Sequence, residues 1–156
     1  MLVGILSDSH DNVPMLRAAV EHLRRLGVEH LIHAGDFVAG FAVKILVESG
    51  IPFTGVFGNN DGGKVRIRSL TPHVHEPPHA FELGGRRIVV VHDAGKLPAP
   101  MREAADVVVC GHTHRPMVEQ NGALVVNPGE CCGWVMGKCT VAVLDLDTLE
   151  ASIVEV

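Results

Sequence analysis

Through the first 60 residues, short apolar runs of strand length alternate with segments in which the apolar residues are spaced as on one face of a helix. Residues 2–6 and 53–57 are nearly all apolar, which is typical of parallel strands covered on both faces. Residues 31–32 predict a further strand between them. Apolar positions three and four apart predict a helix from the N-cap Asn12 to Gly27, and a second helix over residues 41–49. This alternation predicts a parallel sheet with right-handed crossovers.

The rest of the chain is richer in strand and turn signals. Residues 61–78 are polar and predict a short helix followed by a loop. Residues 101–105 offer one or two helical turns before a strand at residues 107–109. Three hairpins are expected, namely residues 80–83 with 88–91, residues 116–119 with 123–126, and residues 138–146 with 149–156. No repeat or linker interrupts the chain, so we expect a single domain over residues 1–156.

Composition and charge narrow the class of protein. The 47% apolar and 20% charged residues are ordinary for a globular protein, and the net charge of −5 argues against a general affinity for nucleic acid. No apolar run approaches the roughly 20 residues that cross a membrane, and no leader peptide is visible. We therefore expect a cytoplasmic protein with four reduced cysteines. The sequence leaves open whether the chain forms a homo-oligomer.

Five apolar runs end in residues that bind metals. Parallel strands bring their carboxyl ends to one edge of a sheet, so these side chains are expected to meet there. A mixture of carboxylate and imidazole suits Mn, Fe, Ni or Zn better than Ca or Mg. Seven side chains are more than one ion takes from a protein, and they fit two ions that share one carboxylate. The seven candidates are Asp8, His10, Asp36, Asn59, His92, His112 and His114.

The motifs that contain these residues resemble the calcineurin-like metallophosphoesterase family, most closely its small single-domain bacterial and archaeal phosphodiesterases. The resemblance extends to Asn127-Pro128-Gly129 and rests on Asp8-Ser9-His10, Gly35-Asp36, Gly58-Asn59-Asn60-Asp61, His92 and Gly111-His112-Thr113-His114. It implies a four-layer α-β-β-α sandwich of two packed sheets flanked by helices. It also implies a metal-dependent phosphoesterase, most often a phosphodiesterase, that commonly uses Mn²⁺.

The resemblance further implies a role for each candidate residue. One ion would take Asp8, His10 and His114, the other would take Asn59, His92 and His112, and Asp36 would bridge them. Two bound ions lower the pKa of water toward ~7, so a bridging hydroxide would attack the phosphorus of a small phosphate ester. The catalytic residues are then Asn59, His92 and Asp36, and the substrate-binding candidates are Asn60 and Arg115.

Three positions depart from the family pattern. Asn60 stands where larger relatives have a histidine, and His92-Asp93-Ala94 stands where small relatives often have His-Gly-His. Neither position supplies a histidine as a general acid, so protonation of the leaving group is unassigned. Glu130 replaces the usual serine, and its carboxylate would repel a phosphate if it faced the site.

Other interpretations compete with the enzyme. A non-catalytic scaffold, like the retromer subunit of the same fold, predicts eroded ligands, whereas all seven candidates are intact here. We expect His33 to be packed or to support the ligands, and Trp134 to pack rather than cover a pocket or stack on a base. The prolines around His73, His75 and His79 favour a solvated loop over a second metal site.

Overall fold

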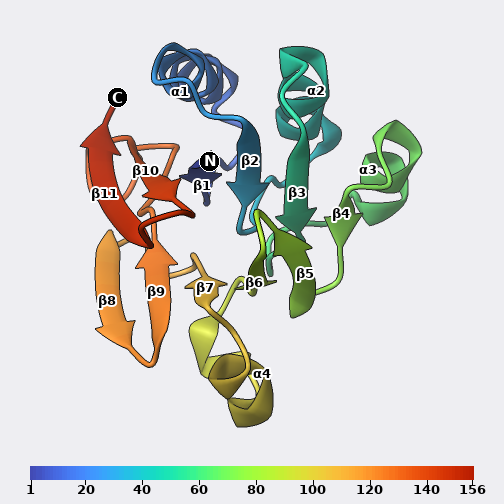
Figure 1. The fold of residues 1–156 in the computed structure, drawn as a ribbon. Coiled ribbons are helices and arrows are strands. Elements are labelled where there is room, and N and C mark those ends of the chain that lie inside the picture. The colour runs from blue at the N-terminus through green and yellow to red at the C-terminus, as the bar shows by residue number, and fades with distance from the viewer.

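Two β-sheets pack face to face, and helices cover the outer face of each, as Figure 1 shows. The computed structural model describes residues 1–156. Helices α1 to α3 lie on one side of the molecule and helix α4 lies on the other. The predicted α-β-β-α sandwich is therefore confirmed.

The first sheet has six strands in the order β11-β10-β1-β2-β3-β4. Strands β1 to β4 run parallel, and β10 and β11 continue the sheet as an antiparallel hairpin. The strands are β1 (Leu2–Leu6), β2 (His30–His33), β3 (Phe53–Val56), β4 (Val74–His75), β10 (Thr140–Asp145) and β11 (Glu150–Glu155). The helices beside them are α1 (Val13–Arg25), α2 (Gly40–Ser49) and α3 (Lys64–Leu70).

Local sequence signals fix these helices. The Asn12 side chain accepts a hydrogen bond from the Met15 backbone N–H and so caps α1, and Pro14 occupies its first turn. Helix α2 ends at Gly50, whose φ of 71° suits the left-handed conformation at a helix C-terminus. The apolar side of α1 is buried against the first sheet through Leu16, Ala19, Val20 and Leu23.

The second sheet has five strands in the order β5-β6-β7-β9-β8. Strands β6, β7 and β9 run parallel, and β5 and β8 pair antiparallel at the two edges. The elements are β5 (His79–Leu83), β6 (Arg86–Val90), the 3₁₀ turn Ala94–Lys96, α4 (Ala99–Glu103), β7 (Val107–Val109), β8 (Met117–Asn121) and β9 (Ala123–Asn127).

Each interface between layers has its own apolar core. One cluster, which includes Leu16 and Phe37, packs the three helices α1, α2 and α3 onto the first sheet. A second, with Ile5 and Val109, lies between the two sheets, and a third, with Val108, lies beneath α4. The middle strands are buried on both faces, which explains why their residues are almost all apolar.

The predicted element order is confirmed except at β4. This strand has only two residues, and its pairing with β3 turns part of the expected loop into an ordered edge. His75 lies in β4 and His79 begins β5, where their rings stack with centroids 3.7 Å apart. The solvated-loop interpretation was therefore wrong for these two histidines. All four cysteines are buried and unpaired, and no helix is long and apolar enough to span a membrane.

Candidate metal centre

The loops that follow β1, β2, β3, β6 and β7 meet at one edge of the sandwich and bring all seven predicted ligands together. Backbone hydrogen bonds hold these loops to each other across long sequence separations. The N–H of Asp8 donates to the Gly35 carbonyl, and the N–H of His10 donates to the Asp36 carbonyl, both at 3.0 Å. The N–H of Gly111 donates to the His92 carbonyl, also at 3.0 Å, and this bond joins the β6 and β7 loops.

Several candidate ligands have strained backbone conformations. Left-handed φ values are uncommon for residues other than glycine and cost of order 1–3 kcal/mol each. Here the strained residues lie in the loops that form the site, and strained backbone conformations are most common at functional sites. The candidates with positive φ are Asp8 (51°), His10 (41°), Asp36 (59°), His112 (68°) and His114 (62°).

Two glycines make room for the carboxylates. A Cβ at Gly58 would collide with the Asp36 carboxylate. A Cβ at Gly111 would collide with the Ser7 hydroxyl and would lie 2.7 Å from Asp8 Oδ2. The loops can therefore approach this closely only because neither residue has a side chain.

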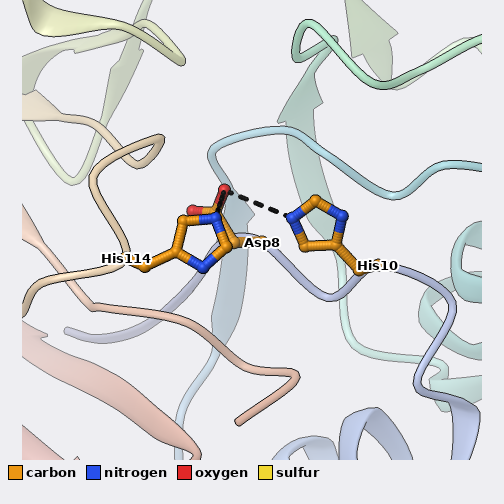
Figure 2. A group of neighbouring side chains, drawn as sticks. All are labelled: Asp8, His10 and His114. Carbon is orange, nitrogen blue, oxygen red and sulfur yellow. Dashed lines mark ion pairs between the residues drawn. The ribbon is translucent and has the colours of Figure 1, made fainter. Parts of the chain in front are cut away.

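Asp8, His10 and His114 form the first group of potential ligands, shown in Figure 2. Both imidazole rings turn toward one carboxylate oxygen, with Asp8 Oδ1 3.8 Å from His10 Nε2 and 3.4 Å from His114 Nε2. The other oxygen, Oδ2, accepts hydrogen bonds from the Ser7 hydroxyl at 2.6 Å and the His112 backbone N–H at 3.1 Å. Asp8 is thus oriented through one oxygen, and Oδ1 remains free to bind a cation.

Asp36 lies between the two groups. Its Oδ2 is 3.6 Å from His10 Nε2 and 3.4 Å from His92 Nε2. The backbone N–H and the side-chain amide of Asn60 donate to the two Asp36 oxygens, each at 2.8 Å. Burial raises the pKa of Asp36, but its contact with the His92 ring and the hydrogen bonds from Asn60 outweigh it and leave the pKa below its usual value. The carboxylate is therefore charged at neutral pH.

The remaining candidates form the second group beside His92. The Asn59 Oδ1 lies 3.0 Å from His112 Nδ1, and the rings of His92 and His112 meet edge to face with centroids 5.2 Å apart. His92 is buried, whereas Asn59 and His112 are exposed. This side of the site is consequently more open to solvent.

Two of the histidines have a tautomer that suits metal binding. The Nδ1–H of His92 donates to the Ala34 carbonyl at 2.7 Å, and the Nδ1–H of His114 donates to Glu130 Oε2 at 2.6 Å. Each Nε2 then carries a lone pair that points at a candidate carboxylate. Burial lowers the pKa of His92, but its contact with Asp36 outweighs burial and raises the pKa overall.

Glu130 supports the site and does not face it. Its carboxylate is fully buried, and besides His114 it accepts hydrogen bonds from the backbone N–H groups of Val135 at 2.9 Å and Met136 at 2.5 Å. Burial raises its pKa, but the hydrogen bonds from His114 and Met136 outweigh it and lower the pKa. The condition under which Glu130 would repel a phosphate is therefore not met, because its oxygens are occupied behind His114.

Asp61, which follows Asn60 in the sequence motif, joins two ligand loops. Its carboxylate accepts hydrogen bonds from the backbone N–H groups of Asp36 at 3.1 Å, Val38 at 2.6 Å and Gly58 at 2.7 Å. Burial raises the pKa of Asp61, and these bonds oppose the rise. The signal in the sequence was an acidic residue three positions after Gly58, in the loop that follows β3.

His33 is fully buried beside the site, and its prediction as a packed or supporting residue agrees with its contacts. Its Nδ1 accepts a hydrogen bond from the Gly35 backbone N–H at 3.2 Å, so the Nε2–H donates to the Ser9 hydroxyl at 3.1 Å. Burial lowers the pKa of His33 to about 3. The ring therefore stays neutral and holds the Gly35 turn that precedes Asp36.

The two predicted substrate-binding residues lie in different surroundings. Asn60 is exposed beside the site, but its amide is directed at Asp36. Arg115 is exposed, and its guanidinium makes no hydrogen bond or ion pair. A role in substrate binding stays a prediction for both.

The cluster has the donor set and the unmet bonding capacity of a metal site. Buried polar atoms almost always have a hydrogen-bond partner. Four buried side-chain atoms lack one here, and three of them face one another in this cluster, namely Asp8 Oδ1, His10 Nε2 and His92 Nε2. A carboxylate oxygen and two imidazole nitrogens in this arrangement fit a divalent transition metal.

Comparison with known proteins agrees with this geometry. The sequence profile of the calcineurin-like phosphoesterase superfamily domain matches residues 1–149. The chain belongs to the calcineurin-like phosphoesterase superfamily. The predicted family and the predicted enzyme class, a phosphoric ester hydrolase, are both confirmed.

Individual members of the superfamily extend the comparison. A phosphodiesterase of Methanocaldococcus jannaschii is 33% identical over 159 residues, which cover 96% of each chain. A solved structure described as a novel archaeal phosphodiesterase is 30% identical, covers 100% of both chains and has a TM-score of 0.88. Vps29 from Entamoeba histolytica, solved as a complex with zinc, is 18% identical over 99% of this chain and 91% of its own, with a TM-score of 0.72. At that identity the likeness to Vps29 shows the fold alone.

Proposed function

We propose that this phosphoesterase is a phosphodiesterase with a dinuclear metal centre. The observation that carries the proposal is the set of three unpartnered buried atoms around the carboxylates of Asp8 and Asp36. The phosphodiesterase names of the archaeal relatives, which match this chain at 30% and 33% identity, support the choice of substrate class.

The two ions are assigned by the grouping of the side chains. The first ion takes Asp8, His10 and His114, whose donor atoms lie within 4.8 Å of one another. The second takes Asn59, His92 and His112. Asp36 would be the carboxylate that both ions share, because its Oδ2 lies near a histidine of each group.

When bound, the two ions supply a hydroxide at neutral pH and neutralise charge on the phosphate oxygens. The residues of the chain fix the geometry in which this happens. Hydrogen bonds to Ser7 and Asn60 orient the carboxylates of Asp8 and Asp36, and the bonds to Ala34 and Glu130 orient His92 and His114. Asn59, His92 and Asp36 are the catalytic residues in this assignment.

Charge favours a phosphate ester as the substrate. Two divalent ions carry four positive charges, and the carboxylates of Asp8 and Asp36 compensate two of them, while the four histidines ligate as neutral imidazoles. A site with net positive charge attracts an anionic phosphodiester.

We assign Mn²⁺ as the metal, with Ni²⁺, Fe²⁺ or Zn²⁺ as alternatives that suit the same donors. The four unpaired cysteines support a cytoplasmic location.

The proposal is tested by metal removal and by replacing the bridging carboxylate. Hydrolysis of an aryl phosphodiester should vanish on chelation and return with Mn²⁺. Asp36→Asn keeps the size of the side chain but removes its charge, so we expect a loss of at least ~10²-fold in turnover, above the range typical of residues that only support a ligand. Asp106→Asn, a change at a half-buried aspartate beside β7, is the matched control.

The scaffold interpretation makes the opposite prediction. A binding protein of this fold would show no hydrolysis in a screen of phosphomonoesters, phosphodiesters and cyclic nucleotides with Mn²⁺. Full activity in metal-free protein, or near-normal turnover in Asp36→Asn, would reject the assignment of the metal centre.

A further inference from the structure

An apolar surface lies beside the proposed metal centre on the loop formed by residues 131–139. Trp134, Val135 and Met136 are consecutive, and their exposed fractions are 64%, 69% and 47%. The ring centroid of Trp134 lies 6.3 Å from that of His10, a proposed metal ligand. The expectation that Trp134 is a packing anchor was therefore wrong, because most of its surface faces solvent at the edge of the site.

The 131–139 loop is held in place although it has no regular secondary structure. The buried carboxylate of Glu130 accepts hydrogen bonds from the backbone N–H groups of Val135 and Met136. At the start of the loop, the Asn12 amide donates to the Cys132 carbonyl at 2.8 Å. Gly133 turns the chain with a φ of 69°, a conformation that glycine adopts without cost.

The same carboxylate connects the loop to the metal centre. Glu130 Oε2 accepts the Nδ1–H of His114 at 2.6 Å, while its oxygens also bind the loop backbone. The backbone that carries Trp134 is therefore tied to His114, whose ring stacks on that of His10 with centroids 5.3 Å apart. A largely exposed aromatic side chain on a loop whose backbone is held beside the proposed metal centre has the properties of a binding surface.

We propose that Trp134 binds a planar aromatic group on the substrate, so that the enzyme prefers phosphodiesters in which one ester group carries such a ring. A nucleobase is the common biological group of this kind, and stacking on an aromatic side chain tolerates any base because every base has a π-face. Val135 and Met136 extend the apolar surface around the ring, and methionine adapts to different shapes. This inference rests on the proposed phosphodiesterase function and specifies its substrate.

The kinetic test uses two diesters with the same leaving group. Phenyl p-nitrophenyl phosphate and methyl p-nitrophenyl phosphate differ only in the ester group that stays on phosphorus, so the ratio of their kcat/KM values reports its recognition. Alanine substitution of an aromatic that stacks on a base costs about 5- to 150-fold. We expect Trp134→Ala to lower the phenyl-to-methyl ratio by about tenfold and Trp134→Phe to retain most of it. Val65→Ala, at an 84% exposed valine of α3, is the control.

A direct binding test uses the fact that Trp134 is the only tryptophan in the chain. In the Mn²⁺-loaded protein, AMP should change the tryptophan fluorescence in a saturable way. Ribose 5-phosphate carries the same sugar and phosphate without the base, and it should leave the fluorescence unchanged.

The outcomes separate this inference from the proposed function. An unchanged phenyl-to-methyl ratio in Trp134→Ala, or equal fluorescence responses to AMP and ribose 5-phosphate, would overturn the role of Trp134 while leaving the phosphodiesterase intact. An equal fall in both kcat/KM values would also overturn it, because the loop would then act only through His114. If the parent protein hydrolysed neither diester, the proposed function would fail, and the fluorescence titration would still decide whether Trp134 contacts a base.

Discussion

Replacing Glu130 by glutamine tests how strongly a buried carboxylate controls the metal centre. Glutamine has nearly the same size, but it carries no charge and presents one amide group where glutamate has a second oxygen. The glutamate oxygens accept bonds from His114, Val135 and Met136. A glutamine can still accept from His114 through its oxygen, and its amide hydrogens would then point at backbone N–H donors.

The magnitude follows from these contacts. Changing a residue that hydrogen-bonds to a metal-binding histidine typically costs 10- to 100-fold in metal affinity, which is about 1.4–2.7 kcal/mol. The backbone N–H groups left facing a donor should lower the free energy of unfolding by a further amount of about 1–3 kcal/mol. We therefore expect both weaker Mn²⁺ binding and lower stability in Glu130→Gln.

The two effects are measured separately. Calorimetric titration with Mn²⁺ gives the affinity of the folded variant, and urea unfolding of the metal-free protein gives its stability. Glu82→Gln makes the same chemical change at an exposed position of β5 and should alter neither quantity. A Glu130→Gln protein with the parent's stability and Mn²⁺ affinity would refute the role assigned to Glu130.

Three further substitutions address the frame around the site. Asp61→Asn should destabilise the protein by about 1–3 kcal/mol in urea unfolding, because an amide cannot accept from the Val38 N–H and the other two donors together; parent-like stability would contradict this. Gly111→Ala should lower the free energy of unfolding by about 1–3 kcal/mol through overpacking, whereas Gly62→Ala, which has open space around it, should change it little. Equal melting temperatures of the two variants would show that the loop after β7 moves to accommodate the added methyl group. Burial lowers the pKa of His33 from 6.5 to about 3, so between these pH values only the unfolded state takes up a proton at this residue. Acidification from pH 7 to pH 5 should therefore lower the free energy of unfolding of the metal-free protein by roughly 2 kcal/mol through His33. The same acidification should cost His33→Asn roughly 2 kcal/mol less than the parent, and an equal loss in both proteins would reject this explanation.

The fold was predictable because its signals are local or periodic. The apolar face of α1 and the near-continuous apolar runs of β1 and β7 mark buried elements in the sequence itself. Strand β4 was missed, since a two-residue strand has no period and forms only because β3 offers it an edge. The same edge places His75 against His79, a contact that no spacing in the sequence indicates.

The ligand set was predictable for a related reason. Parallel strands bring their carboxyl ends together, so metal-binding residue types that follow Leu6, Val56 and Val109 were expected to meet. The supporting residues were harder to assign, because their roles depend on which way a loop turns. Glu130 turns behind His114 and away from a phosphate, and Trp134 turns outward although tryptophan more often packs.

We propose that this chain binds two metal ions that share Asp36. The most direct measurement is the number of Mn²⁺ ions bound per chain, determined by equilibrium dialysis and metal analysis on the parent protein and on Asp36→Asn. We expect about two ions in the parent and fewer in the variant, with both proteins folded. One ion or none in the parent, or two tightly held ions in Asp36→Asn, would contradict it.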